Sequence, residues 1–213
     1  MRSAELLGTP MVVTGLYYAL LSFLLAGLVG HFIAPWTAVP LVLFGLFCLW
    51  FFRDPERAIP RGPVAVSPAD GKVVLVRHRP ERTEVCIFMN VFDVHVNRTP
   101  IGGKVVAVTY SPGKFMVASR DEASCANERN TIAVEARDGV RVTFSQIAGL
   151  IARRIVCRVK PGDYVTTGER IGMIQFGSRV DVDLGSEWTI EVSEGQRVKA
   201  GATVLARRLA SEG

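Results

Sequence analysis

Two stretches of the chain share one short pattern: Val159-Lys-Pro-Gly-Asp-Tyr-Val-Thr-Thr-Gly-Glu-Arg-Ile171 and Val192-Ser-Glu-Gly-Gln-Arg-Val-Lys-Ala-Gly-Ala-Thr-Val204. Glycines that separate short β-branched segments are typical of β-hairpins. The sequence therefore predicts two related hairpins, with the Gly177–Ser178 bond in the connection between them. We expect their apolar residues to share one barrel-like core: Val159, Val165, Ile171, Val192, Val198 and Val204.

The sequence from residue 64 onward predicts a mainly β domain, a β-rich α+β fold of barrel or sandwich type. Segments rich in Val, Ile, Phe and Thr alternate there with Gly, Pro or Asp. The expected strands are 71–77, 83–92, 103–110, 130–135 and 140–147. A short helix is expected around 148–155, and a loop with a helical turn around 116–129. The sequence contains no dinucleotide-binding glycine motif and no P-loop.

Two apolar segments precede this domain. Met11–Ile33 is long enough to cross a bilayer as a helix, and Leu41–Phe52 is apolar but shorter. The proline-containing stretch between them predicts a turn. We interpret the pair as a membrane-embedded helical hairpin, and the alternative is a buried helical hairpin of a soluble core.

The positions of the cations predict how this hairpin is oriented. The turn has no Lys or Arg, whereas Arg53, Arg57 and Arg61 follow the second segment directly. Because positive flanks stay on the cytoplasmic side, we expect the domain that follows to lie in the cytosol, held at the cell membrane. The expected organisation is a hairpin over 1–52, a linker over 53–63 and a domain over 64–213.

Charge and cysteine usage exclude several classes of function. The net charge is +5, without Lys/Arg blocks interleaved with aromatic residues, so nucleic acid is not an expected partner. The cysteines are scattered with no C-x-x-C pair, which indicates reduced thiols rather than disulfides or a zinc site: Cys48, Cys86, Cys125 and Cys157. No metal is expected.

Three polar stretches are candidates for chemistry. Ser67-Pro-Ala-Asp-Gly-Lys72 is either an ordinary Asp-Gly turn or the source of a functional Asp70. In the second stretch, Asp93, His95 and Asn97 alternate with valines and would share one face of a strand, which is either solvated or functional. The third, residues 121–130, is either a solvated loop or a ligand-binding loop.

One possible function is nucleophilic chemistry, because the chain has an acid, a base and a hydroxyl that could act together. Asp70 would orient the imidazole of His95, and the imidazole would take the proton of a serine hydroxyl. In Phe176-Gly-Ser-Arg179, a tight turn would bring the hydroxyl of Ser178 to the carbonyl of Gly177, and glycine permits such a backbone. The available chemistry is then on the chain itself.

Two other interpretations of the glycine pattern differ in class. The pattern is similar to the β-core of zinc endopeptidases, but the sequence has no His-x-His pair to bind zinc. It is also similar to lipoyl- and biotinyl-type carrier barrels, which present a lysine at a hairpin tip. Lys72 follows Asp70-Gly71, so a non-catalytic, membrane-tethered binding or carrier module is the alternative to an enzyme.

Taken together, the motifs resemble the phosphatidylserine decarboxylase family in its short, membrane-associated form. The matching elements follow one another in order from Phe52 onward: Phe52-Arg-Asp-Pro-Glu-Arg-Ala-Ile-Pro60, Ser67-Pro-Ala-Asp-Gly-Lys-Val73, Phe88-Met-Asn-Val-Phe-Asp-Val-His-Val-Asn-Arg-Thr-Pro100, Asn127-Glu-Arg-Asn130, Gln146-Ile-Ala-Gly-Leu-Ile-Ala-Arg-Arg154 and Phe176-Gly-Ser-Arg-Val-Asp181.

The resemblance implies a pyruvoyl cofactor that the enzyme makes from its own Ser178. The family's maturation set maps onto Asp70, His95 and Ser178, and cleavage at Gly177–Ser178 would give a β-chain, 1–177, and an α-chain, 178–213. The two chains would remain associated. The pyruvoyl group would form a Schiff base with the serine head group and act as an electron sink during decarboxylation, and His95 would transfer the proton that follows.

The cleavage site has a second candidate in Leu184-Gly-Ser-Glu187. We choose Gly177–Ser178 because Arg179-Val180 continues the family pattern after the serine, and we interpret Leu184–Glu187 as a turn. For the substrate, phosphatidylserine in the bilayer is expected, archaetidylserine is the alternative, and a homodimer is implied. The expected substrate-binding residues are Asp93, Asn97, Arg98, Asn127 and Arg129.

Overall fold

The structure is a computed structural model that describes residues 10–113, 127–149, 155–174 and 178–208. The chain forms two compact units, Met1–Glu56 and Arg57–Gly213. The first contains helix α1 (Pro10–Phe32), the short 3₁₀ helix η2 (Pro35–Ala38) and helix α2 (Val39–Phe51). Pro35 and Pro40 lie in the first turns of η2 and α2, where a missing N–H costs no helical hydrogen bond.

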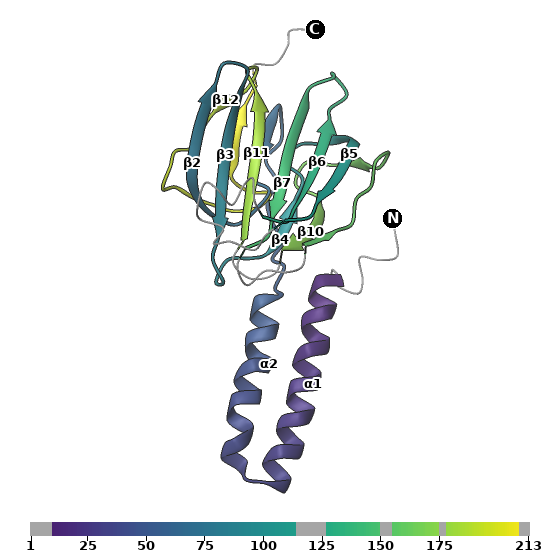
Figure 1. Cartoon of the computed structure of the whole chain (residues 1–213), viewed down its shortest axis with the longest axis vertical. Coiled ribbons are helices and arrows are strands. Elements are labelled where there is room, and N and C mark those ends of the chain that lie inside the picture. The colour runs from purple at the N-terminus through teal and green to yellow at the C-terminus, as the bar shows by residue number, and fades with distance from the viewer. Residues whose placement is uncertain (1–9, 114–126, 150–154, 175–177, 209–213) are drawn as a thin grey trace. The chain divides into compact units, whose positions relative to one another are not determined.

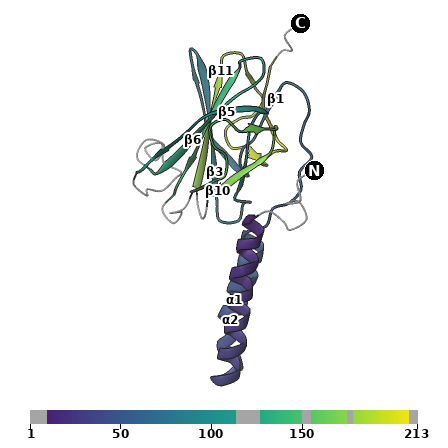
Figure 2. The ribbon, with the colours of Figure 1, turned by 90° about the vertical axis from the view of Figure 1, so that its right-hand side faces the viewer.

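Small residues let the two helices of the first unit pack side by side (Figure 1 and Figure 2). Ala19 and Ser22 of α1 are buried, and the Ser22 hydroxyl donates to the carbonyl of Leu41 at 2.7 Å. A Cβ added to Gly45 would lie 2.4 Å from the ring of Phe23, so close approach there requires glycine. This packing is the kind seen between helices in membranes.

The outward side chains of α1, η2 and α2 are large and apolar: Leu16, Leu20, Leu24, Leu28, Trp36, Leu43 and Leu46. By length and composition, Val12–Phe32 could cross a membrane, and Pro35–Phe51 is a shorter apolar helical segment. The predicted apolar helix at the N-terminal end is therefore confirmed.

The second unit is β-rich, as predicted. Its strands are β1 (Val64–Val66), β2 (Gly71–Arg79), β3 (Arg82–Met89), β4 (Val96–Arg98), β5 (Gly103–Ser111), β6 (Arg129–Glu135), β7 (Arg141–Ile147), β8 (Ile155–Cys157), β9 (Tyr164–Val165), β10 (Arg170–Ile174), β11 (Ser178–Gly185), β12 (Thr189–Ile190), β13 (Arg197–Val198) and β14 (Val204–Arg207). The proline-containing stretch 53–63 before them forms no helix or strand.

One antiparallel sheet dominates this unit, with strand order β13-β2-β3-β11-β7-β6-β5-β9. The sheet curls around two three-stranded sheets, β1-β14-β12 and β4-β10-β8 (Figure 1). β11 pairs with β3 on one side and with β7 on the other, so the strand that begins at Ser178 is central.

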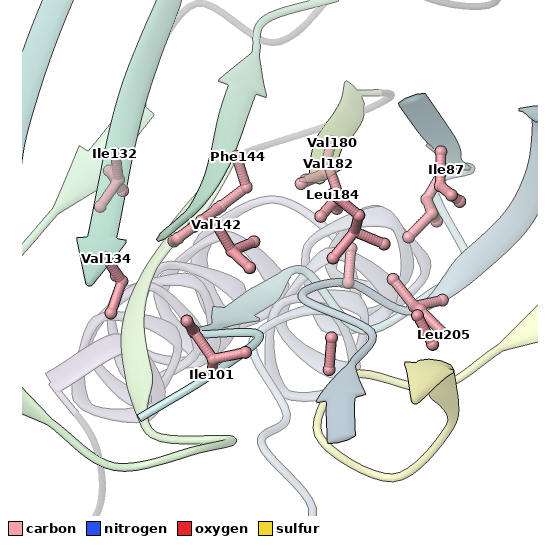
Figure 3. Close-up of a cluster of buried hydrophobic side chains, with 14 of the residues drawn as sticks. Ile87, Ile101, Ile132, Val134, Val142, Phe144, Val180, Val182, Leu184 and Leu205 are labelled. Carbon is pink, nitrogen blue, oxygen red and sulfur yellow. The ribbon is translucent and has the colours of Figure 1, made fainter. Parts of the chain in front are cut away.

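The apolar core lies on the inner face of this sheet (Figure 3). β11 contributes Val180, Val182 and Leu184, which are fully buried beside Phe144 of β7 and Leu205 of β14. Burying one such side chain contributes about 1.5–3 kcal/mol before the cost of ordering it. Because side chains alternate along a strand, the residues between these three point to the opposite face.

The two hairpin stretches have matching local geometry. Gly168 and Gly201 occupy equivalent positions in the pattern, and their φ angles are +75° and +73°. Residues other than glycine are strained at such φ angles, so the two turns favour glycine at these positions. β9 of the first stretch pairs with β5, and β13 of the second pairs with β2.

The structure corrects five details of the sequence analysis. The predicted strand 83–92 ends at Met89, and only 96–98 of the alternating stretch is a strand. That stretch has no exposed polar face, because every residue from 93 to 100 is buried. Residue 155 of the predicted helix begins β8, while residues 150–154 lie outside the described residues. Residues 159 and 204 are only half-buried.

Candidate active site around Ser178

Ser178 lies fully buried at the first position of β11, paired with Met89 of β3. Its hydroxyl donates to the sulfur of Met89 at 3.4 Å. A thioether is a weak acceptor, so this contact orients the hydroxyl without holding it strongly. Gly177, the other half of the predicted cleavage site, lies outside the described residues.

A row of buried amides continues from this sulfur. The Nδ2 of Asn97 donates to Met89 at 3.8 Å, and the Nε2 of Gln146 donates to the Oδ1 of Asn97 at 2.9 Å. The Nδ2 of Asn130 donates in turn to the Oε1 of Gln146 at 3.1 Å. These side chains are at most 4% exposed, so Ser178 faces a polar wall within an otherwise apolar core.

His95 is fully buried and lies close to the segment that leads into Ser178. Its carbonyl accepts a hydrogen bond from the N–H of Ile174 at 3.4 Å. The Nδ1 of the ring lies 2.9 Å from the carbonyl oxygen of Asp93. Because a carbonyl only accepts, Nδ1 carries the proton and Nε2 of the neutral ring can act as a base. This hydrogen bond to the main chain fixes the tautomer, a role the sequence analysis gave to Asp70.

The carboxylate of Asp93 holds the turn before His95. Its Oδ2 accepts from the N–H of Asn90 at 2.9 Å, and its Oδ1 is paired with the guanidinium of Arg197. Asp93 is 6% exposed. The ion pair joins residues on opposite sides of the predicted cleavage site.

Asp70 lies in the turn before β2 and is engaged by two donors. Its Oδ1 accepts from the N–H of Ala200 at 2.8 Å, and its Oδ2 pairs with Arg57 at 2.8 Å. Burial raises the pKa of this carboxyl above its usual range, and the nearby charge of Asp93 raises it further. Ala200 and Arg57 oppose that rise.

The remaining predicted site residues are Arg98, Asn127 and Arg129. Arg98 is 5% exposed and donates to the carbonyl of Gly168 at 2.9 Å. Asn127 donates to the carbonyl of Ala148 at 2.8 Å. Arg129 begins β6 and lines a cavity of about 460 Å³ over the outer face of the sheet.

An arginine-centred cluster lies beside this cavity. Glu84, Cys86 and Asp181 place potential ligand atoms within 4.8 Å of one another. The buried guanidinium of Arg179 donates to Asp181 at 2.5 Å and to the sulfur of Cys86 at 2.7 Å. Burial raises the pKa of the Cys86 thiol. Arg179 therefore supplies the positive charge of this cluster, which ties β11 to β3.

The structure describes the residues of two alternatives that the sequence raised. Ser186 of the second candidate cleavage site is exposed, in a turn closed by a hydrogen bond from the N–H of Trp188 to the carbonyl of Gly185 at 3.2 Å. Lys72 lies within β2, paired with residues of β3 and β13, rather than at a hairpin tip. That position is wrong for a carrier lysine.

Four residues that contact the predicted site were missed from the sequence: Arg57, Met89, Gln146 and Arg197. Each lies in a segment whose pattern predicts a linker, a strand or a hairpin. Arg57, Met89 and Gln146 lie within stretches that match the family, and this match was the available signal.

Comparison with known proteins identifies the family. Residues 44–206 match the phosphatidylserine decarboxylase family. A phosphatidylserine decarboxylase proenzyme of Solibacter usitatus is 59% identical over 199 residues, which cover 93% of this chain and 97% of that protein. The proenzyme of Oleidesulfovibrio alaskensis is 52% identical over 192 residues, covering 86% and 88%. That of Nitratidesulfovibrio vulgaris is 47% identical over 215 residues, covering 98% of each chain.

These matches span nearly the whole chain at high identity. The chain belongs to the phosphatidylserine decarboxylase family.

Proposed function

We propose that this chain is a self-processed phosphatidylserine decarboxylase, which converts phosphatidylserine to phosphatidylethanolamine with a pyruvoyl group made from Ser178. Membership of the family carries this proposal. The burial of Ser178 at the start of a central strand supports the choice of serine, because a fixed hydroxyl is what attack on the preceding peptide bond requires.

Self-cleavage begins when Oγ of Ser178 attacks the carbonyl carbon of Gly177. The peptide nitrogen leaves as the amine of residue 178, and the amide becomes an ester. Loss of the Cα proton then breaks the Cβ–Oγ bond, so Oγ stays in the new carboxylate of Gly177. Water hydrolyses the resulting dehydroalanine to a ketone and releases ammonia.

His95 is the proposed base for the first step. Its Nδ1 is held by the carbonyl of Asp93, which leaves Nε2 to take the hydroxyl proton. Asp70 completes the proposed maturation set. The buried carboxylate lies near enough to Asp93 for their charges to interact.

The residues around Ser178 fit a pyruvoyl group, because buried amide donors and acceptors adjoin the position. A pyruvoyl group there would supply a ketone for the head-group amine and an electron sink for the pair left behind when carbon dioxide departs. His95 then transfers a proton to the product. The proposed head-group residues are Asp93, Asn97, Arg98, Asn127 and Arg129.

We place the protein at the cell membrane through residues 1–52, with 53–63 as linker and 64–213 as a catalytic domain on the cytoplasmic side. The apolar outward faces of α1 and α2 support the membrane segment. Arg53, Arg57 and Arg61 after α2 support this orientation. A homodimer remains part of the proposal.

We further propose that the two hairpin stretches are lipoyl-like repeats of a barrel-like domain, one in each fragment of the cleaved chain. The matching turns at Gly168 and Gly201 support this relation. Val165, Ile171, Val192 and Val198 all belong to one core, which would hold the fragments 1–177 and 178–213 together.

Intact mass measurement tests the proposal directly. Purified protein should contain fragments 1–177 and 178–213, the second without a free amino terminus, whereas a Ser178→Ala variant should stay whole. Vesicles of phosphatidylserine should be decarboxylated only by the cleaved protein, and vesicles of the ether-linked archaetidylserine test the alternative substrate. Cleavage at another bond, or decarboxylation by Ser178→Ala, would refute the proposal.

A further inference from the structure

The buried amide row beside Ser178 has one fixed direction. Asn130 donates through Nδ2, so it must face the carbonyl oxygen of Gln146, and the Nε2 of Gln146 then faces Asn97. Because the Nε2 of Gln146 only donates, Asn97 must turn its Oδ1 toward that nitrogen. The Nδ2 of Asn97 is thereby left on the side of Met89 and Ser178.

The sheet framework holds this row in place. Asn130 and Gln146 are register partners on β6 and β7, and Gln146 is also the register partner of Val180 on β11. Gln146 and Asn97 are both fully buried, so water does not compete for their hydrogen bonds. The sheet therefore holds the row in place, and the thioether of Met89, which can only accept, requires the N–H side of Asn97 at its end of the row.

The row ends on an acceptor that binds its donors weakly. The sulfur of Met89 lies 3.8 Å from the Nδ2 of Asn97 and 3.4 Å from the Oγ of Ser178. An N–H that donates to a thioether loses little free energy when it changes acceptor to an oxygen that becomes more negative. The Oγ of Ser178 becomes such an oxygen when its proton leaves.

We propose that Gln146, itself held by Asn130, is a positioning residue for self-cleavage. It keeps the N–H side of Asn97 toward Ser178, where Nδ2 donates to Oγ as that oxygen loses its proton. The inference rests on the proposed self-cleavage at Ser178 and adds to it the group that stabilises the developing charge.

Gln146→Glu tests this direction because the side chain keeps its shape while its hydrogen bonding depends on pH. When the introduced carboxyl is protonated, it donates to the oxygen of Asn97, as glutamine does. When it is ionised it only accepts, so it turns the N–H side of Asn97 away from Ser178. The residues that bond to or pair with this position, Asn130, Asn97 and Val180, carry no charge.

The measurement is the rate of self-cleavage of freshly made precursor across a pH series, expressed as the ratio of variant to wild type. Effects of pH that are common to both proteins largely cancel in this ratio. We expect a ratio near one at low pH and a fall of about tenfold or more as pH rises. Because burial raises the pKa of a glutamate, the ratio should fall at a pH above the ordinary glutamate pKa of about 4.3. A ratio that does not change with pH would overturn the inference.

Gln146→Leu and Ser145→Ala complete the test. Leucine removes the donor at all pH values, so cleavage should be slow throughout. Ser145 lies next to Gln146 on β7 but faces outward, where its hydroxyl contacts Thr131 at 2.8 Å, so its variant should cleave at the wild-type rate. Wild-type cleavage by Gln146→Leu, or equal slowing by Ser145→Ala, would refute a positioning role. Cleavage of Ser178→Ala would instead refute the proposed function.

Discussion

Two turns in the second unit have similar sequences and share two hydrogen bonds: Ser67-Pro-Ala-Asp-Gly-Lys-Val-Val74 and Thr99-Pro-Ile-Gly-Gly-Lys-Val-Val106. In each, the first hydroxyl donates to the carbonyl two residues later at 2.7 Å. The first residue's carbonyl also accepts from a hairpin glycine, Gly201 at 2.8 Å or Gly168 at 2.9 Å.

The turns differ at the fourth position, where Asp70 corresponds to Gly102. At Asp70 the carboxylate accepts from the N–H of Ala200, whereas at Gly102 the main-chain N–H donates to the hydroxyl of Thr167, both at 2.8 Å. The second turn forms without a carboxylate. Asp70 is therefore not needed to make the turn, which favours its functional interpretation.

The largest effect should come from Asp70→Asn. The amide oxygen can still accept from Ala200, so we expect the fold to persist while self-cleavage slows by about 10²–10⁴-fold. Intact mass over time measures cleavage, and thermal unfolding measures the fold. If the variant cleaved at the wild-type rate, Asp70 would have only a structural role in its turn, as Gly102 has.

Arg57→Gln should have the next largest effect, through the pKa of Asp70. Burial raises that pKa and Arg57 opposes the rise, so removing the guanidinium should raise it further. If ionised Asp70 is required, the acid limb of the cleavage profile moves to higher pH, and the rate below that limb falls several-fold. Arg61→Gln, at an exposed position of the same linker, is the matched control. An unshifted profile would contradict this role of Arg57.

Met89→Leu should have a smaller effect. Lys72, which follows the first turn, pairs with Phe88, and Lys104, which follows the second, pairs with Glu135. Met89 therefore corresponds to Ala136 beside the second turn, where there is no serine to orient. Leucine preserves the volume but not the acceptor, and we expect cleavage to slow about threefold. Turnover per mole of pyruvoyl should change less, since Oγ has left by then. Equal losses in both rates would indicate a packing defect.

The smallest effect should come from the lysines that follow the two turns. Lys72 and Lys104 are exposed and occupy corresponding positions, so Lys72→Gln and Lys104→Gln should both change cleavage and decarboxylation by less than about twofold. Activity assays and intact masses check this. A lysine-linked group on Lys72, or a loss of activity confined to Lys72→Gln, would favour the carrier interpretation.

Local patterns predicted much of this fold because they depend on neighbouring residues. Glycine spacing located the two hairpin stretches, and alternation located β2, β5, β6 and β7 within a few residues. Alternation failed at 93–97, because every residue of that stretch is buried, whichever way its side chain points. Burial on both faces depends on strands distant in sequence, which a local pattern does not reveal.

The site was predicted in part for the same reason. Asp70, His95 and Ser178 came from residue chemistry and family motifs, and the structure places each of them in a buried position. Gln146 occurs in a strand pattern where a polar residue usually faces solvent, and its inward direction follows from the register with Val180. Arg57 lies in a linker, and nothing local pairs it with a carboxylate thirteen residues away.

The central place of β11 has a consequence for the lifetime of the enzyme. Under the proposed cleavage, this strand enters the sheet between β3 and β7 while the chain is still one piece, and only then does it lose its covalent connection. A molecule that later unfolds releases two separate chains. The shorter chain no longer has Ser178 at its first position and cannot regenerate it. Refolding would require a bimolecular encounter, so the working life of each molecule is set by its unfolding rate rather than by an equilibrium.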